Sequence, residues 1–142
     1  MYLAKGISAT GTAIFLNEHK TLILSDLHLG YEEAANRQGV MLPRVQFKEL
    51  MAAIGKMLAS AGKIEQVILN GDLKHDFGRI SEQEWRDVLK LLDFLAVKAK
   101  RIIVVKGNHD AFLGPIARKR GVELVHSVRL GAVLVLHGDK LP

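Results

Sequence analysis

The sequence predicts an α/β fold of layered helices and strands. Segments with the spacing of amphipathic helices alternate with short apolar segments that have the length of strands. Two of these strands, at residues 65–69 (EQVIL) and 101–105 (RIIVV), contain continuous apolar runs. Such runs indicate burial on both faces, as in a sheet that lies between two other layers. The chain contains no repeat, low-complexity tract or linker, so we expect one domain over residues 1–142.

Six strands are expected along the chain. Residues 12–16 and 21–25 flank the turn Asn17-Glu18-His19-Lys20 and predict a hairpin. The two buried strands follow at 65–69 and 101–105, and two more are expected near 123–125 and 132–136.

Two long helices are predicted between these strands. Pro43 suits the first turn of the earlier helix, and Gly62 is placed to end it. Ser81 and Glu84 have the spacing of a capping box at the start of the later helix. The expected apolar faces consist of Phe47, Leu50, Met51, Ile54 and Leu58 in the first helix and of Trp85, Val88, Leu92 and Leu95 in the second. A short third helix is expected from Gly114-Pro115 to Gly121.

The composition excludes several classes of protein. With 142 residues, 49% apolar and 25% charged, the chain has the composition of an ordinary globular protein. The absence of Cys excludes a disulfide framework and a thiolate metal site. No apolar run has the roughly 18 residues of a membrane helix, and the start lacks the pattern of a secretory signal, so we expect no membrane partner and a cytoplasmic location.

The charge of the chain is compatible with a polyanionic partner such as nucleic acid. The net charge is +5 and the isoelectric point is about 9.6. The densest basic segment, Arg118-Lys119-Arg120, lies where a helix is expected to end, and there positive charge also complements the helix dipole. Charge alone therefore does not decide the partner.

Asp, Asn and His residues follow four of the predicted strands directly. In chain order, these clusters are Asp26-Leu27-His28, Gly71-Asp72, Gly107-Asn108-His109-Asp110 and His137-Gly138-Asp139. In open α/β sheets, ligands bind beyond the carboxyl ends of the strands. If the four strands are neighbours, the clusters converge on one edge of the sheet.

The residue types in these clusters indicate a site for divalent metal ions. Asp, Asn and His form a mixed oxygen and nitrogen ligand set that suits Mn, Zn, Fe or Ni rather than a closed structural zinc site. Asp26 and His28 would share one face of an extended segment and could hold one ion together, and Asp72 could bridge two ions. Two ions about 3.5–4 Å apart can hold a phosphate and activate a water. Each cluster alone could be a polar turn, but four at strand ends favour the metal site.

The order Asp26-x-His28, Gly71-Asp72-x-x-His75, Gly107-Asn108-His109-Asp110, His137 resembles the calcineurin-like metallophosphoesterase family, over residues 21–139. The segments 26–32 (DLHLGYE) and 71–75 (GDLKH) more closely resemble small prokaryotic phosphoesterases of the DNA-ligase-associated and repair-nuclease-like branch. The resemblance implies a four-layer α/β/β/α sandwich with a two-metal site.

The resemblance also implies a role for each residue of the clusters. Asp26 and His28 would bind the first metal, Asp72 would bridge, and the second metal would be bound by Asn108 and His137. His109 would donate a proton to the leaving group or a hydrogen bond to the phosphoryl oxygens, and Asp110 would orient its ring.

The resemblance stops before the family's last motif. That motif, Gly-His-x-His, gives one histidine to each metal, and the present chain reaches Pro142 without it. We therefore expect a sandwich that is incomplete at the C-terminus, and the activity of the chain stays open.

The implied function is hydrolysis of a phosphoester substrate by a two-metal-activated water, with manganese as the first choice of metal. A phosphodiesterase or nuclease acting on nucleic acid or nucleotides is favoured. Open alternatives are a phosphomonoesterase for a small substrate and a non-catalytic scaffold that keeps the fold. Separately from the function, an exposed sheet edge could allow the chain to form a homodimer.

Other residues near the expected edge have two interpretations each. His75 could contact substrate or cap the chain locally, and Tyr31 could stack on a base. His19 and His126 are interpreted as structural or exposed. The basic residues that could hold substrate phosphates or simply be solvated are Arg37, Arg44, Lys74 and Arg79.

Overall fold

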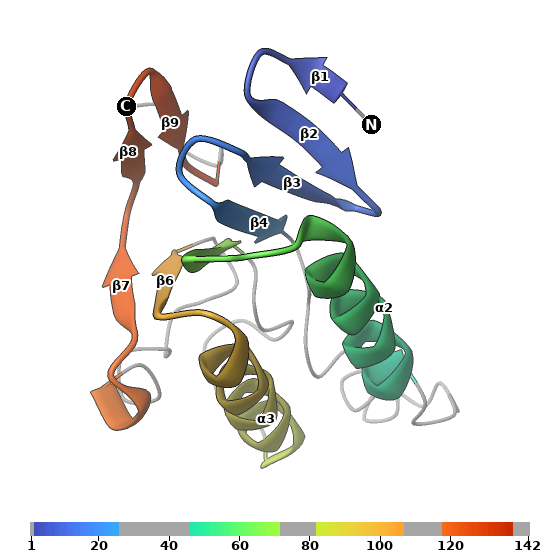
Figure 1. Ribbon diagram of the computed structural model, residues 1–142. Coiled ribbons are helices and arrows are strands. Elements are labelled where there is room, and N and C mark those ends of the chain that lie inside the picture. The colour runs from blue at the N-terminus through green and yellow to red at the C-terminus, as the bar shows by residue number, and fades with distance from the viewer. Residues whose placement is uncertain (1, 26–45, 72–81, 107–117, 138–142) are drawn as a thin grey trace.

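A central sheet of seven strands lies between a pair of helices and a two-stranded sheet (Figure 1). The computed structural model describes residues 2–25, 46–71, 82–106 and 118–137. The predicted α/β class and the sandwiched sheet are confirmed. Helices, central sheet and second sheet form three of the four expected layers, and the residues that the structure describes contain no second helical layer.

The central sheet has the order β1-β2-β3-β4-β5-β6-β7, in which the first four strands are antiparallel neighbours and β4 to β7 are parallel. The second sheet consists of β8 paired antiparallel with β9. The strands are β1 (Tyr2–Ala4), β2 (Ile7–Thr10), β3 (Ala13–Leu16), β4 (Thr21–Ser25), β5 (Gln66–Asn70), β6 (Arg101–Val105), β7 (Glu123–Val125), β8 (Val128–Leu130) and β9 (Val133–Val135).

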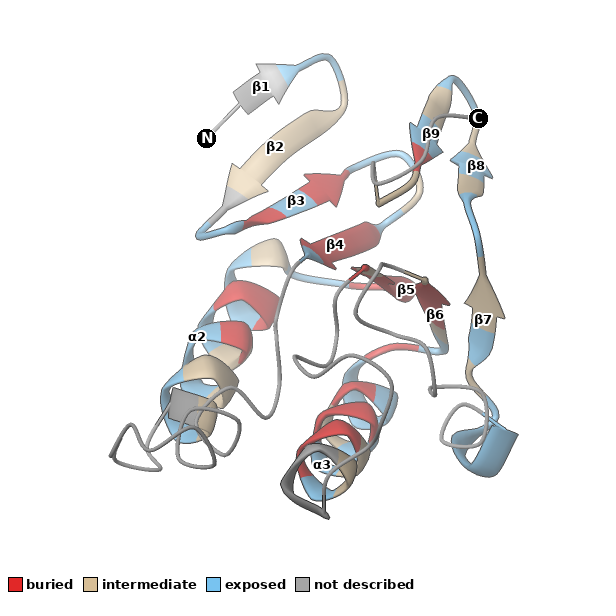
Figure 2. Ribbon diagram, turned by 180° about the vertical axis from the view of Figure 1, so that it is seen from behind, coloured by how far each residue is buried: buried red, intermediate tan, exposed pale blue. Residues whose placement is uncertain are grey.

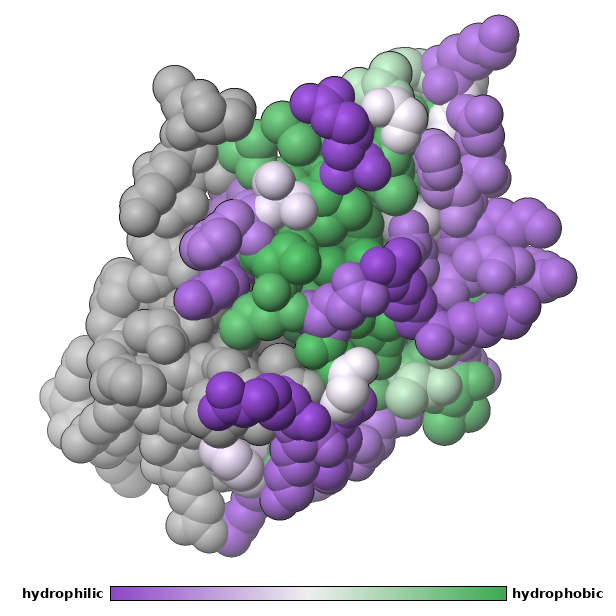
Figure 3. Space-filling model, turned by 90° about the vertical axis from the view of Figure 1, so that its left-hand side faces the viewer, coloured by the Kyte–Doolittle hydropathy of each residue, from purple (hydrophilic) through white to green (hydrophobic). Residues whose placement is uncertain are grey.

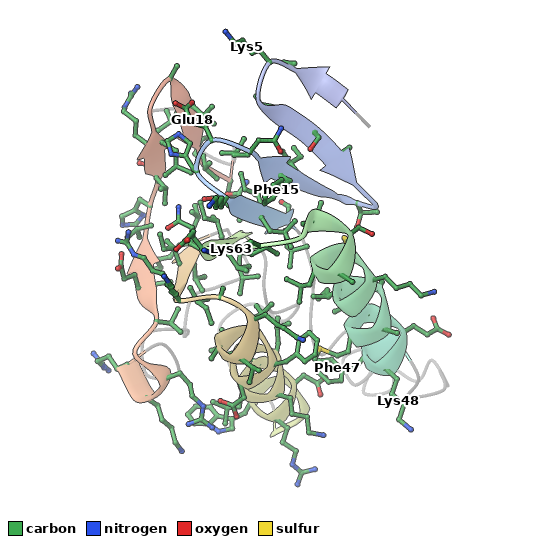
Figure 4. All side chains as sticks on the ribbon, in the orientation of Figure 1. Lys5, Phe15, Glu18, Phe47, Lys48 and Lys63 are labelled. Atoms are coloured by element: carbon green, nitrogen blue, oxygen red, sulfur yellow. The ribbon has the colours of Figure 1, made fainter. Side chains whose placement is uncertain are left out.

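The two helices cover one face of the central sheet. They are α2 (Gln46–Ala61) and α3 (Glu82–Lys98), and Gly62, with φ of +78°, ends α2 as predicted. Figure 4 shows Phe47 on the side of α2 that faces α3, and Lys48 pointing away from the molecule. Within the described part of the chain, neither helix is long and apolar enough to cross a membrane.

The predicted apolar faces of both helices pack in the core. Ile54 and Leu58 are buried on α2, and Val88, Leu92 and Leu95 are buried on α3. Figure 2 shows the buried stripes of both helices turned toward the sheet. The remaining predicted core residues, Phe47, Leu50, Met51 and Trp85, are partly buried against the same core.

Alternate residues of each central strand contribute to two separate apolar clusters. On the helix side, Leu22 and Leu24 of β4 pack with Val67 and Leu69 of β5. On the other side, the cluster contains Leu16, Ile23, Ile68, Ile103, Val105 and, from β9, Val135. The continuous apolar runs are therefore buried on both faces, as the sequence predicts.

The second cluster extends to the margin of the molecule. Val125 of β7 and Val128 of β8 are partly buried and pack against it. Seen from the side on which β7 and β8 lie, apolar side chains gather in the middle of the face with hydrophilic ones around them (Figure 3). The β8–β9 sheet thus closes one part of the second face by apolar contact.

Three strands were not expected from the sequence. The structure adds β1, β2 and β8, each of three or four residues. All three are too short to show a period, and β2 is half-exposed where its side chains are described. The strand expected at 132–136 is also shorter, because β9 spans Val133–Val135.

The packing of α3 allows a direct test of the core. We expect Leu95→Ala, at a side chain with no exposed area, to lower the free energy of unfolding by about 2–5 kcal/mol. Val97→Ala on the same helix, where the side chain is 82% exposed, should change it by less than about 0.5 kcal/mol. Urea titration followed by circular dichroism measures both, and equal losses would contradict the packing described.

Candidate metal centre and active site

Three of the four predicted clusters leave the same edge of the central sheet. Ser25, Asn70 and Val105 are in register at the carboxyl ends of β4, β5 and β6. The first cluster begins directly after Ser25, and the next two begin within two residues of Asn70 and Val105. The condition for convergence, that these parallel strands are neighbours, is therefore met.

Hydrogen bonds continue across this edge beyond the strands. Ser25 Oγ donates to the carbonyl oxygen of Asn70 at 2.8 Å, and the Gly71 amide donates to the carbonyl oxygen of Val105 at 2.8 Å. The Lys106 amide donates to the carbonyl oxygen of Val125 at 2.9 Å. The backbone is thus fixed up to the points at which the clusters start.

The fourth cluster reaches the same edge from the second sheet. His137 lies two residues after β9 and is half-buried. Asn70 Nδ2 donates to the carbonyl oxygen of Leu136 at 3.0 Å, which holds the chain after β9 to the end of β5. Asn70 at the end of β5 and Leu136 just after β9 are 66 residues apart in sequence, and they meet at this edge.

The ring of His137 lies directly against the backbone of Gly71. A Cβ atom added to Gly71 would overlap the Nδ1 and Cγ atoms of His137. Gly71 also has φ of +80°, a conformation that side-chain-bearing residues rarely adopt. Glycine is therefore required here for two reasons, and the residue that follows it in the chain is Asp72.

Of the predicted site residues, His137 lies in the described part of the chain. Asp26, His28, Asp72, Asn108, His109 and Asp110 lie outside it, as do the more weakly supported His75, Tyr31, Arg37, Arg44, Lys74 and Arg79. Within the described residues there is no group of three or more His, Asp or Glu side chains that could hold a metal ion. The structure therefore fixes the supports of the proposed ligands and the position of one of them.

Two other histidines lie away from this edge. His126 is exposed between β7 and β8, in agreement with its interpretation as structural or exposed. His19 is half-buried in the β3–β4 turn, and its Nε2 lies 3.5 Å from the place of a Cβ atom on Gly131. His19 thus contacts the turn between β8 and β9.

Asn70 lies at this edge, and the sequence analysis did not select it. Its Oδ1 is buried and, among the described residues, has no hydrogen-bond partner. The signal in the sequence was an amide side chain at the end of an otherwise apolar strand, directly before Gly71-Asp72. Such a buried polar group calls for a specific explanation.

Comparison with known proteins connects this edge with a family. A model of the calcineurin-like phosphoesterases matches residues 19–140. The chain belongs to the calcineurin-like phosphoesterase family. Members of this family act on phosphoester bonds with divalent metal ions, and the matched segment contains all four clusters.

A solved structure has the same fold as this calcineurin-like phosphoesterase chain. The crystal structure of Pseudomonas putida nuclease MPE superposes with a TM-score of 0.60 and 22% sequence identity. The match covers 87% of the present chain and 56% of the nuclease chain. A comparison with curated proteins found no match.

The described edge fits a metal centre of this family. The half-buried imidazole of His137 lies on Gly71 at the end of β5, and the buried Oδ1 of Asn70 is a polar atom there without a partner among the described residues. Imidazole and oxygen donors without thiolates suit divalent ions of the first transition row. The ends of β4, β5 and β6 direct the other three clusters to the same edge.

The contact between Gly71 and His137 can be tested against a matched glycine. We expect Gly62→Ala, with φ of +78° and no atom within 4 Å of the new Cβ, to cost only the backbone strain, about 1–2 kcal/mol. Gly71→Ala adds the overlap with His137 and should cost about 1–3 kcal/mol more. Chemical denaturation of both variants measures the difference, and equal costs would show that the ring does not lie on Gly71.

Proposed function

We propose that this chain is a metal-dependent phosphoester hydrolase, and more closely a phosphodiesterase that acts on nucleic acid or nucleotides with two divalent ions. The observation that carries the proposal is the meeting of β5 and β9 at Gly71 and His137, beside the ends of β4 and β6. Four clusters of ligand-type residues follow these strands. If the clusters converge at this edge, they would supply the ligands of a two-metal site.

The residues of the clusters divide into ligands and a proton donor. Asp26 and His28 would hold one ion and Asn108 and His137 the other, with Asp72 between them. When bound, the two ions supply the positive charge that binds a phosphoryl group and activates a water molecule. Family membership and the mixed oxygen and nitrogen donor set support this assignment.

His109 would act on the leaving group. A neutralised leaving oxygen departs more easily, and an imidazolium within hydrogen-bond reach can supply the proton. Asp110, the next residue, would accept a hydrogen bond from the ring and fix its orientation. His109, oriented by Asp110, would act on the substrate, and neither residue would hold metal.

A polyanionic substrate is supported by the charge of the chain and by its structural neighbour. The net charge of +5 favours association with nucleic acid, and the neighbour with the same fold is a nuclease. Manganese as the metal, a cytoplasmic location and a homodimer formed through a sheet edge stay predictions.

The first test is hydrolysis of bis-p-nitrophenyl phosphate with added Mn²⁺. We expect turnover that EDTA abolishes and that Asp72→Asn lowers by more than about 100-fold, because loss of a metal ligand costs at least as much as loss of its hydrogen-bond partners. Asp93→Asn is the matched control, since Asp93 is exposed on α3 and pairs with Arg120 at 2.8 Å.

Other results of this assay decide between the alternatives. Cleavage of p-nitrophenyl phosphate but not of the diester would replace the phosphodiesterase by a phosphomonoesterase. A folded wild-type chain without turnover on either ester, and without bound Mn²⁺, would favour the scaffold.

The proton-donor role of His109 predicts a dependence on the leaving group. His109→Gln should have little effect on bis-p-nitrophenyl phosphate, because nitrophenolate leaves without protonation. With a dinucleotide, whose alkoxide needs a proton, the rate should fall about 10²–10⁴-fold. His126→Gln, at an exposed position between β7 and β8, is the control. Equal losses on both substrates would mean that His109 acts on the phosphoryl oxygens instead.

A further inference from the structure

Asn70 occupies the junction between the two sheets. It is the last residue of β5, its carbonyl oxygen accepts from Ser25 Oγ, and its Nδ2 donates to the carbonyl oxygen of Leu136. The next residue on one side of the junction is Gly71, and the next on the other side is His137. The side chain of Asn70 therefore links the end of β5 to the chain after β9. The residues that follow at these two places, Gly71 and His137, touch each other.

This hydrogen bond limits the movement of His137. Leu136 lies outside β9, so its carbonyl oxygen is not part of the β8–β9 ladder. Without a partner, the chain after β9 could rotate about its backbone angles and carry the imidazole away from Gly71. The Nδ2 donor restricts this rotation one residue before the ring, at a distance of 3.0 Å.

The side chain that performs this function is itself held in one orientation. The carbonyl oxygen of Leu136 accepts but cannot donate, so the amide group must turn Nδ2 toward it, which leaves Oδ1 on the other side. That oxygen is buried, and no donor among the described residues reaches it.

We propose that Asn70 is a positioning residue that fixes the imidazole of His137 against Gly71, the residue before Asp72, and so sets the metal affinity of the site. The proposal rests on the proposed function in one respect, namely that His137 is a metal ligand. It goes beyond that function because Asn70 is neither a ligand nor a proton donor in it.

The chain offers a matched control on the same strand. Gln66 lies four residues before Asn70, on the same face of β5, and its Nε2 donates to Thr21 Oγ1 at 2.8 Å. Both residues are amides that make one side-chain hydrogen bond to a neighbouring segment. Gln66 is at the opposite end of the strand, so its loss disturbs the sheet but not the edge that carries the clusters.

The experiment compares Asn70→Ala, Asn70→Leu, Gln66→Ala and Gln66→Leu without substrate. Titration calorimetry gives the Mn²⁺ dissociation constant, and the ring signal of His137 in the metal-free protein is followed by NMR, assigned by its loss in His137→Gln. Both Asn70 variants should weaken Mn²⁺ binding about 10–100-fold and shift the His137 signal. Both Gln66 variants should change neither.

Asn70→Leu separates positioning from stability. Leucine has nearly the shape of asparagine and removes the unsatisfied Oδ1, which offsets part of the cost of leaving the Leu136 carbonyl without its donor, so the variant should fold even if Asn70→Ala does not. A folded Asn70→Leu variant with a shifted His137 signal and weakened Mn²⁺ binding would support the proposal. An unmoved signal with wild-type affinity, or equal changes in the Gln66 variants, would overturn it.

The same measurements distinguish this proposal from the proposed function. If the wild type neither binds Mn²⁺ nor hydrolyses the diester, but the His137 signal responds to Asn70→Leu alone, the proposed function fails and the positioning of His137 stands. If the wild type binds Mn²⁺ and is active but Asn70→Leu leaves both readouts unchanged, the positioning role fails and the proposed function stands.

Discussion

The contact between the His137 ring and the backbone of Gly71 constrains both sheets at once. Gly71 extends β5 through its hydrogen bond to Val105, and His137 follows the last strand of the second sheet. The ring fits only if residue 71 has no Cβ atom and takes a positive φ. The backbone of the central sheet therefore provides the surface on which the histidine rests. The placement of the second sheet follows from this surface, since a displaced β9 would move His137 away from the end of β5.

The strength of the sequence pattern determined which strands could be predicted. β4, β5 and β6 contain apolar runs that are buried on both faces, so their composition alone marks them. β1, β2 and β8 carry no such run, because each has only three or four residues. The register of Ser25, Asn70 and Val105 could not be predicted either, because no local pattern encodes which strands become neighbours.

The residues of the candidate site could likewise be predicted only where local properties of the sequence mark them. His137 was selected because His is a metal-ligand type of residue and the position follows a strand, both of which are local properties. Gly71 was selected only as part of the Gly71-Asp72 cluster, because its contact with His137 is a property of the folded chain. Asn70 was passed over because its partner, Leu136, is 66 residues away and apolar, so nothing in either segment points to the other. The sequence analysis therefore selected His137 and missed the side chain that holds the chain next to it.

The small size of the second sheet explains the use of a hydrogen bond from Asn70 to the chain after β9. Two strands of three residues are marginal by themselves, so the β8–β9 sheet depends on contacts with the rest of the chain. Val135 packs in the second cluster, and His19 contacts the turn at Gly131. These contacts hold the body of the hairpin, and His137 lies beyond its last ladder pair. A hydrogen bond from the Asn70 amide to Leu136 adds a directional interaction there, which an apolar side chain cannot provide. The apolar strand β5 therefore ends in an asparagine where the two sheets meet.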